Sequence, residues 1–175
     1  MYDIFDEKLE GTPEAKGRVR VPIVYVQKPA HTQAFTAARS TDPSFFKAGI
    51  NLLVDLELLD SRPDHLHHRN SGLDTTSAKQ CAANKVLVGI NLANLRAMNP
   101  VVLGRVQQNI ALCRKHGANM CVFSNAKSAA EFAQPQDVLS LLRVLGMSPL
   151  QAKQTLTNLE RAYRAHVEKH AKANS

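Results

Sequence analysis

The densest group of potential metal ligands in the sequence is Asp64-His65-Leu66-His67-His68, which follows an apolar segment. Two imidazoles in a His-x-His arrangement can bind one divalent metal ion, and Asp60 or Asp64 could add an oxygen ligand, as in metal-dependent phosphoesterases with barrel-like folds. Such a site needs further His, Asp or Glu ligands, but the ends of the later strands offer Asn91, Asn94, Ser124 and Asn125. We therefore interpret the segment as a basic polar loop and keep a stand-alone metal-dependent phosphoesterase as the alternative.

Other catalytic patterns are absent from the sequence. It contains no Gly-rich phosphate-binding or dinucleotide-binding loop and no Gly-x-Ser-x-Gly turn around a nucleophile. Residues 75–130 contain no Asp or Glu at all, so this stretch cannot supply a pair of carboxylates for acid–base catalysis. We predict no catalytic residue and no metal ligand in this chain.

Positive charge is concentrated in the body of the chain, whose formal net charge is +7. Residues 1–15 contain five acids and one lysine, whereas the acid-free window 75–130 contains seven basic residues. An uncompensated positive field of this kind favours a nucleic-acid partner. Because only 5% of the residues are aromatic and Trp is absent, recognition of backbone charge and shape is favoured over stacking on single-stranded bases.

The three cysteines and the N-terminal residues indicate the cellular compartment in which we expect the protein. Cys81, Cys113 and Cys121 match neither a disulfide framework nor a zinc-binding pattern, and we expect them to be small buried residues in a reducing environment. The first residues are acidic, unlike a signal peptide, and no apolar run is long enough to span a membrane. We expect a cytoplasmic protein with no membrane partner.

Apolar runs and helical patterns alternate along the chain. Strands are expected at 21–26, 50–56, 85–92 and 119–124, with a short further strand at 2–5. A weak helix is expected at 30–39, followed by helices at 75–84, from Asn99-Pro100 to His116, from Pro135 to Gly146, and from Ser148-Pro149 onward.

This alternation is typical of a parallel α/β layer, which forms either an open doubly wound sheet or a barrel, and we expect a TIM-barrel-like β/α barrel. A complete barrel needs about 250 residues, so the barrel should be reduced or open at the N-terminus. We expect one domain over residues 1–175, with an N-terminal segment at 1–20 and a flexible polar tail at 168–175. Ligands should gather at the carboxyl ends of the strands, where we expect residues 27–28, 57–70, 91–98 and 124–130.

Several short motifs, in order, resemble a known family. Gly72-Leu73-Asp74, Ala78-Lys79 and the run from Asn84 to Leu92 are similar to the core of archaeal ribonuclease P protein component 3, the 30-kilodalton subunit family. The similarity extends over roughly residues 70–157, through Leu112-Cys113-Arg114-Lys115-His116-Gly117, Ser124-Asn125-Ala126, Pro135-Gln136-Asp137-Val138, Leu145-Gly146-Met147 and Gln151-Ala152-Lys153.

The resemblance implies a partial or complete β/α barrel that serves a ribonucleoprotein. In that family the RNA subunit, with Mg²⁺, removes the 5′ leader from precursor tRNA, and the protein is a non-catalytic subunit that binds no cofactor itself. The implied partners are ribonuclease P RNA, precursor tRNA and a second protein, component 2.

The resemblance to the family and the basic residues of the acid-free window 75–130 together predict a set of RNA-binding residues. Lys79 and Lys153 stand where the family carries lysines, and Arg69 lies in a loop where the family is also basic. The chain departs from the family at Ala93 and Ala133, where arginines are common, and at Thr75, where a histidine is common. The complete set of predicted RNA contacts is Lys79, Lys153, Arg69, Lys85, Arg96, Arg105 and Lys127.

Overall fold

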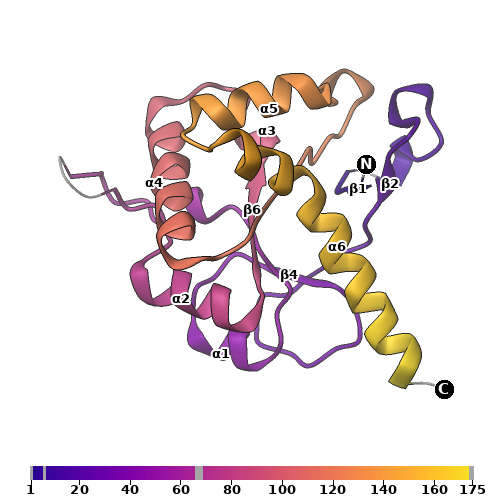
Figure 1. The fold of residues 1–175 in the computed structure, drawn as a ribbon, viewed down its shortest axis with the longest axis horizontal. Coiled ribbons are helices and arrows are strands. Elements are labelled where there is room, and N and C mark those ends of the chain that lie inside the picture. The colour runs from indigo at the N-terminus through magenta and orange to yellow at the C-terminus, as the bar shows by residue number, and fades with distance from the viewer. Residues whose placement is uncertain (1, 6, 66–68, 174–175) are drawn as a thin grey trace.

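Short parallel strands and surrounding helices form the computed structural model, which describes residues 2–5, 7–65 and 69–173 (Figure 1). Two sheets are present, one with the order β1-β2 and one with the order β3-β4-β5-β6-β7, and all their pairings are parallel. The strands are β1 (Tyr2–Asp3), β2 (Val19–Arg20), β3 (Val24–Tyr25), β4 (Thr36–Ala38), β5 (Leu52–Leu53), β6 (Leu87–Asn91) and β7 (Met120–Phe123).

The two sheets join into one ring. Strands β2 and β3 belong to a single extended segment interrupted near Pro22; its first half pairs with β1 and its second half with β4. On the far side, the N–H of Asn125 donates to the carbonyl of Ile4, and Phe5 bridges to Ala126. Backbone pairing therefore runs from β1 through β2–β3, β4, β5, β6 and β7 and returns to β1, which makes a reduced parallel barrel.

Local signals in the sequence set the helix boundaries. The side chain of Asp74 caps α2 in a reciprocal pair with Ser77, and Asn99 followed by Pro100 begins α4, which ends at Gly117 with φ 74°. The α-helices are α1 (Pro43–Lys47), α2 (Thr75–Asn84), α3 (Leu92–Leu95), α4 (Pro100–His116), α5 (Pro135–Val144) and α6 (Pro149–Ala173). Single 3-10 turns occur at η1 (Glu7–Leu9), η2 (Pro13–Ala15), η3 (Leu56–Leu58) and η4 (Ala129–Glu131).

Alternate residues of each strand face opposite sides of the ring. Leu52, Leu87, Cys121 and Phe123 belong to the inner cluster of buried side chains. Gly89 occupies an inward-facing position of β6, where an added Cβ would come within 2.8 Å of the Phe123 ring. The outer cluster instead joins neighbouring strand residues to the apolar faces of α1, α2, α4 and α5. Both faces of the sheet are thus covered, as the continuous apolar runs predict.

Helix α6 crosses the amino-terminal end of the ring and runs diagonally across the view in Figure 1. The side-chain amide of Asn158 donates to the carbonyl of Met120 at the start of β7, at 2.8 Å. Eight residues later along the helix axis, His166 lies 2.9 Å from the carbonyl of Gln33, which precedes β4. Leu159 is fully buried in the inner cluster. The helix therefore closes this end of the barrel, and it continues as a helix through residues 168–173.

The expected helix at 30–39 is wrong, because residues 36–38 form β4. This strand pairs with β3 on one side and β5 on the other, and its residues are buried. The alanines of the segment favour a helix locally, but pairing with two neighbouring strands in the sheet overrides that preference. The other expected strands and helices are present, although the strands are shorter than the apolar runs; the expected strand at 21–26 contains only β3, and β2 lies before it.

The three cysteines are buried and free. Burial raises the pKa of Cys81 and of Cys113 to about 12 and raises that of Cys121 as well, so these thiols are poor nucleophiles. In the part of the chain that the structure describes, no helix is both long enough and apolar enough to cross a membrane.

The contact that holds β1 in the ring yields a first prediction. The Asp3 carboxylate is fully buried, accepts hydrogen bonds from the N–H groups of Ser124 and Ile4, and pairs with Arg18 at 2.7 Å. Asp3→Asn keeps the shape of the side chain but leaves Arg18 without its counter-charge. We expect urea denaturation to show a loss of about 3 kcal/mol in the free energy of unfolding.

Glu7→Gln is the matched control, because Glu7 forms an exposed ion pair with Arg20 at 3.5 Å. An exposed pair contributes less than about 1 kcal/mol. Equal losses in the two variants would show that Asp3 does not hold the ring closed.

Candidate nucleic-acid interface

Four polar side chains meet at the carboxyl ends of β5 and β6. Asp55 follows β5 with a left-handed φ of 53°, and its carboxylate accepts from the side-chain amides of Asn91 and Asn94, each at 2.8 Å. Asn94 also donates to Glu57 at 2.8 Å. Glu57 is only 2% exposed, and burial raises its pKa. The two amides thus occupy both carboxylates, so this cluster stabilises the carboxyl end of the barrel.

Arg105 fastens the long loop after β5 to helix α4. Its guanidinium donates to the backbone carbonyls of Glu57, Asp60 and Arg62 at 2.6–3.1 Å and to the Asp64 carboxylate at 2.9 Å. Arg105 is only 6% exposed. The prediction of Arg105 as an RNA contact is therefore corrected: position in the basic window did not reveal that the loop carbonyls bury this guanidinium.

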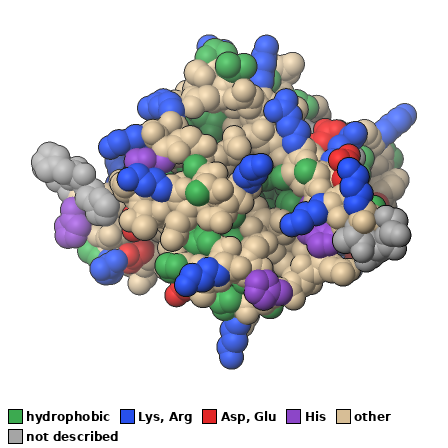
Figure 2. All heavy atoms as spheres, turned by 60° about the horizontal axis from the view of Figure 1, so that its bottom comes forward, with side chains coloured by type: hydrophobic (Ala, Val, Ile, Leu, Met, Phe, Trp, Pro, Cys, Tyr) green, Lys and Arg blue, Asp and Glu red, His purple; other side chains and the backbone are tan. Residues whose placement is uncertain are grey.

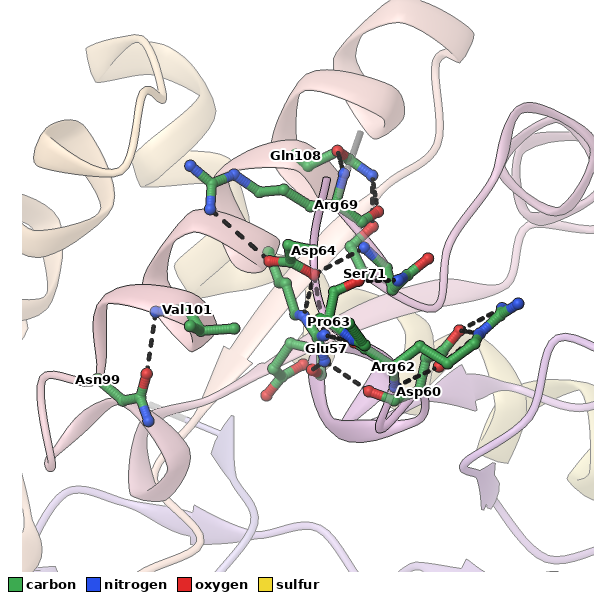
Figure 3. A network of polar contacts seen from close by, with 12 residues as sticks. Glu57, Asp60, Arg62, Pro63, Asp64, Arg69, Ser71, Asn99, Val101 and Gln108 are labelled. Carbon is green, nitrogen blue, oxygen red and sulfur yellow. Dashed lines mark hydrogen bonds and ion pairs between the residues drawn. The ribbon is translucent and has the colours of Figure 1, made fainter. Parts of the chain in front are cut away.

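Arg69 lies on the other side of the same carboxylate (Figure 3). One of its guanidinium nitrogens is 3.7 Å from Asp64, and its backbone exchanges two hydrogen bonds with the side chain of Gln108. The guanidinium lies over Gly104 of α4, where an added Cβ would come within 2.4 Å of it. The Arg69 side chain remains 46% exposed, so it is both held in place and accessible to a phosphate.

The proposed metal ligands have other partners. The Asp60 carboxylate pairs with Arg62, and hydrogen bonds from Arg62 lower the pKa of Asp60 to about 2 (Figure 3). The Asp64 carboxylate is shared by two arginines, and His65 is exposed. No group of three potential ligands occurs among the residues that the structure describes, and His67 and His68 lie outside them. The geometry of the described residues therefore gives the phosphoesterase alternative no support.

The remaining predicted contacts are spread over the surface. Lys79 on α2, Lys153 on α6 and Lys127 after β7 are exposed. Lys85 is exposed at the end of α2, on the amino side of β6. Arg96 donates to Glu131 and to the carbonyl of Ser124, so it joins the ends of β6 and β7 while keeping 35% of its side chain exposed. The structure therefore brings Arg69 and Arg105 together around Asp64 but does not gather all seven residues into one patch.

Sequence reasoning missed two groups that organise the molecule. The expected strand at 50–56 includes Asp55, whereas β5 ends at Leu53; a carboxylate inside an apolar run is the signal that could have marked it. Arg18 was not singled out, although it pairs with buried Asp3 and lies 4.5 Å from the centre of the Phe132 ring. No local pattern marks Arg18, because its partners come from distant segments.

Comparison with known proteins places this arrangement in a family. A sequence model described as RNase P subunit p30 matches residues 18–171. Ribonuclease P protein component 3 of Methanosarcina acetivorans is 30% identical over 128 residues, which cover 69% of this chain and 54% of that protein. The same component of Methanothermobacter thermautotrophicus is 26% identical over 123 residues, which cover 65% of this chain and 50% of that protein. The chain thus spans about half the length of these curated relatives.

A solved structure shares the fold. A chain in a cryo-EM structure of archaeal ribonuclease P with mature tRNA superposes with a TM-score of 0.64 at 15% sequence identity, covering 95% of this chain and 80% of that chain. With the parallel ring described above, this likeness confirms the expected TIM-barrel-like α/β fold class.

The structural role of Arg105 can be tested with Arg105→Lys. Lysine carries one ammonium group and cannot donate to three carbonyls and a carboxylate in the geometry of a guanidinium. We expect the free energy of unfolding to fall by about 3 kcal/mol in urea denaturation. The matched control, Arg62→Lys, changes a side chain that is 77% exposed, and its loss should stay below about 1 kcal/mol. Full stability in Arg105→Lys would contradict the structural assignment.

The Asp64 carboxylate makes this contribution dependent on pH. The hydrogen bond from Arg105 is the main cause of a pKa below the usual value of 3.8. A lowered pKa means that the carboxylate stabilises the fold above that value and stops doing so as the pH falls through the lowered one. Urea denaturation should therefore show a larger difference between the wild type and Asp64→Asn at pH 7 than at pH 3. A difference that does not change with pH would contradict the ion pair.

Proposed function

The chain belongs to the RNase P subunit p30 family, and from this premise we propose that it is a protein subunit of the ribonuclease P ribonucleoprotein. In this proposal the RNA subunit removes the 5′ leader from precursor tRNA, and the protein supports that RNA without catalytic residues of its own. The observation that carries the proposal is the family match over residues 18–171, which includes strands β2 to β7 and most of α6.

The chemistry of the surface supports this role. The net charge is +7, and Lys79, Lys85, Lys127 and Lys153 present their side chains to solvent. Each lysine near a phosphate displaces condensed counterions, so binding of a polyanion should weaken steeply with salt. The described carboxylates at the carboxyl end of the ring are meanwhile occupied by amides and arginines. This combination suits a protein that binds and organises RNA.

The proposal extends to partners and compartment. Ribonuclease P RNA and precursor tRNA are the nucleic-acid partners, component 2 is the protein partner, and the Mg²⁺ ions belong to the RNA. We place the complex in the cytoplasm, where the three free cysteines would remain reduced.

Reconstituted cleavage tests the proposal. Precursor tRNA is incubated in Mg²⁺ with the chain alone, with cognate ribonuclease P RNA, and with that RNA plus component 2. We expect the chain to stimulate cleavage only when the RNA is present. Metal-dependent cleavage by the chain alone would instead support the phosphoesterase, and no stimulation in any mixture would overturn the proposal.

Lys79→Glu refines this experiment, with Lys16→Glu as the control of equal charge change near the acidic N-terminal segment. If Lys79 lies near a phosphate, the Lys79→Glu variant should bind RNA with a weaker salt dependence, and the slope of log K against log salt should change by about one unit. Its stimulation of precursor tRNA cleavage should also fall. Identical behaviour of the two variants would remove Lys79 from the set of contacts.

A further inference from the structure

A large hollow of the described surface lies at the amino-terminal end of the ring, opposite the end where β/α barrels usually bind ligands. It has a volume of about 750 Å³ and lies between α6 and the segments that lead into β4, β5, β6 and β7. A second hollow of about 170 Å³ shares Asn119 and Asn158 with it, so the two lie side by side along α6. We call this surface the α6 groove; Figure 2 shows the molecule turned so that the lower part of Figure 1 comes forward.

One side of α6 forms a wall along the whole groove. Its lining residues recur every three or four positions from Gln151 through Asn158 and Arg161 to Lys169, which is the spacing of one helix face. Eighteen residues of helix extend about 27 Å. The groove is therefore an elongated track, longer than a small molecule would need.

The charged groups of the groove are all basic. Lys85 comes from the end of α2, Arg161 and Lys169 from α6, and Arg114 from the end of α4, and no Asp or Glu lines either hollow. Within residues 2–5, 7–65 and 69–173, neither Lys85, Arg161 nor Lys169 forms an ion pair with a carboxylate. Figure 2 shows blue side chains around a hollow with green side chains in its depth. Arg114 donates to the carbonyl of Gly146, whereas Lys85, Arg161 and Lys169 are available to pair with an external anion.

Other side chains of the α6 groove are either polar or buried. Asn84 and Asn119 contribute side-chain amides, which can bond to phosphate and sugar oxygens. The aromatic residues of the lining, Phe35 and Phe46, are only 3% and 6% exposed, so they offer no surface on which a base could stack. His166 is held between Gln33 and Asn51 and packs edge-on against Phe35, and burial lowers its pKa. It shapes the wall and adds little charge at neutral pH.

We propose that the α6 groove binds a stretch of RNA sugar-phosphate backbone, with Lys85, Arg161 and Lys169 as the phosphate contacts. The inference rests on the proposed function and assigns it a surface outside the positions predicted at the carboxyl end of the ring. Arg161 and Lys169 are eight residues apart on one helix face, about 12 Å, so they reach different phosphates. An elongated cationic track without exposed aromatic rings fits backbone recognition and is independent of base sequence.

The test compares two double variants of equal charge. Arg161→Gln with Lys169→Gln removes two groove cations, and Lys16→Gln with Arg143→Gln removes two exposed cations elsewhere. Fluorescently labelled ribonuclease P RNA is titrated with each protein at several salt concentrations, and circular dichroism verifies folding. We expect the groove variant to lose about 1.6 units of salt slope and roughly tenfold to twentyfold in affinity at 0.15 M salt, and the control to lose much less.

Lysine acetylation gives a second readout that needs no substitution. RNA should protect Lys85 and Lys169 of the wild type from acetylation, as measured by mass spectrometry, and should leave Lys16 reactive. Equal binding by the two double variants, or no protection of Lys85 and Lys169, would overturn the groove while wild-type stimulation of cleavage still supported the proposed function. Displacement of the RNA by polyglutamate at matched charge would show an acidic peptide site and also overturn it. Failure of the wild type both to bind the RNA and to stimulate cleavage would overturn both proposals.

Discussion

The closed ring of strands depends on a buried carboxylate. Asp3 accepts hydrogen bonds from Ile4 on its own strand and from Ser124 at the end of β7, while Arg18 supplies the compensating charge. Strand β1 has only two residues, so its backbone hydrogen bonds alone would hold it weakly. A buried ion pair with extra hydrogen bonds fixes both the position and the register of this strand. The acidic N-terminal segment thereby becomes part of the barrel.

Arginine and lysine have different tasks in this protein. Arg18, Arg96 and Arg105 donate to backbone carbonyls and carboxylates, which a planar guanidinium with several donors does well. The predicted lysines project into solvent instead. Net charge therefore overstates the charge that a partner can reach, and the exposed cations are a better guide to the interface than the number of basic residues in a window.

The two ends of the barrel also differ in whether their charged side chains are paired within the chain. At the carboxyl end, Asn91 and Asn94 occupy the oxygens of Asp55 and Glu57, and Arg105 ties down the adjoining loop. At the amino end, α6 crosses the ring and leaves a long hollow with basic walls. In barrels that are enzymes the carboxyl end carries the reactive groups. Here Asn91, Asn94 and Arg105 donate to the carboxylates of Asp55, Glu57 and Asp64, although Oδ2 of Asp64 accepts no hydrogen bond.

Local sequence determined the helices α2 and α4, because Asp74 and the Asn99-Pro100 pair begin them and Gly117 ends the second through short-range hydrogen bonds and backbone preferences. It also determined the apolar runs of β6 and β7, the basic character and the family resemblance. Only the tertiary structure decided that residues 36–38 form a strand, that Arg105 is buried while Lys79 is exposed, and that Lys85 lies on the same groove as Arg161 and Lys169. Strand pairing and burial depend on contacts between residues far apart in the chain, and local patterns do not contain those contacts.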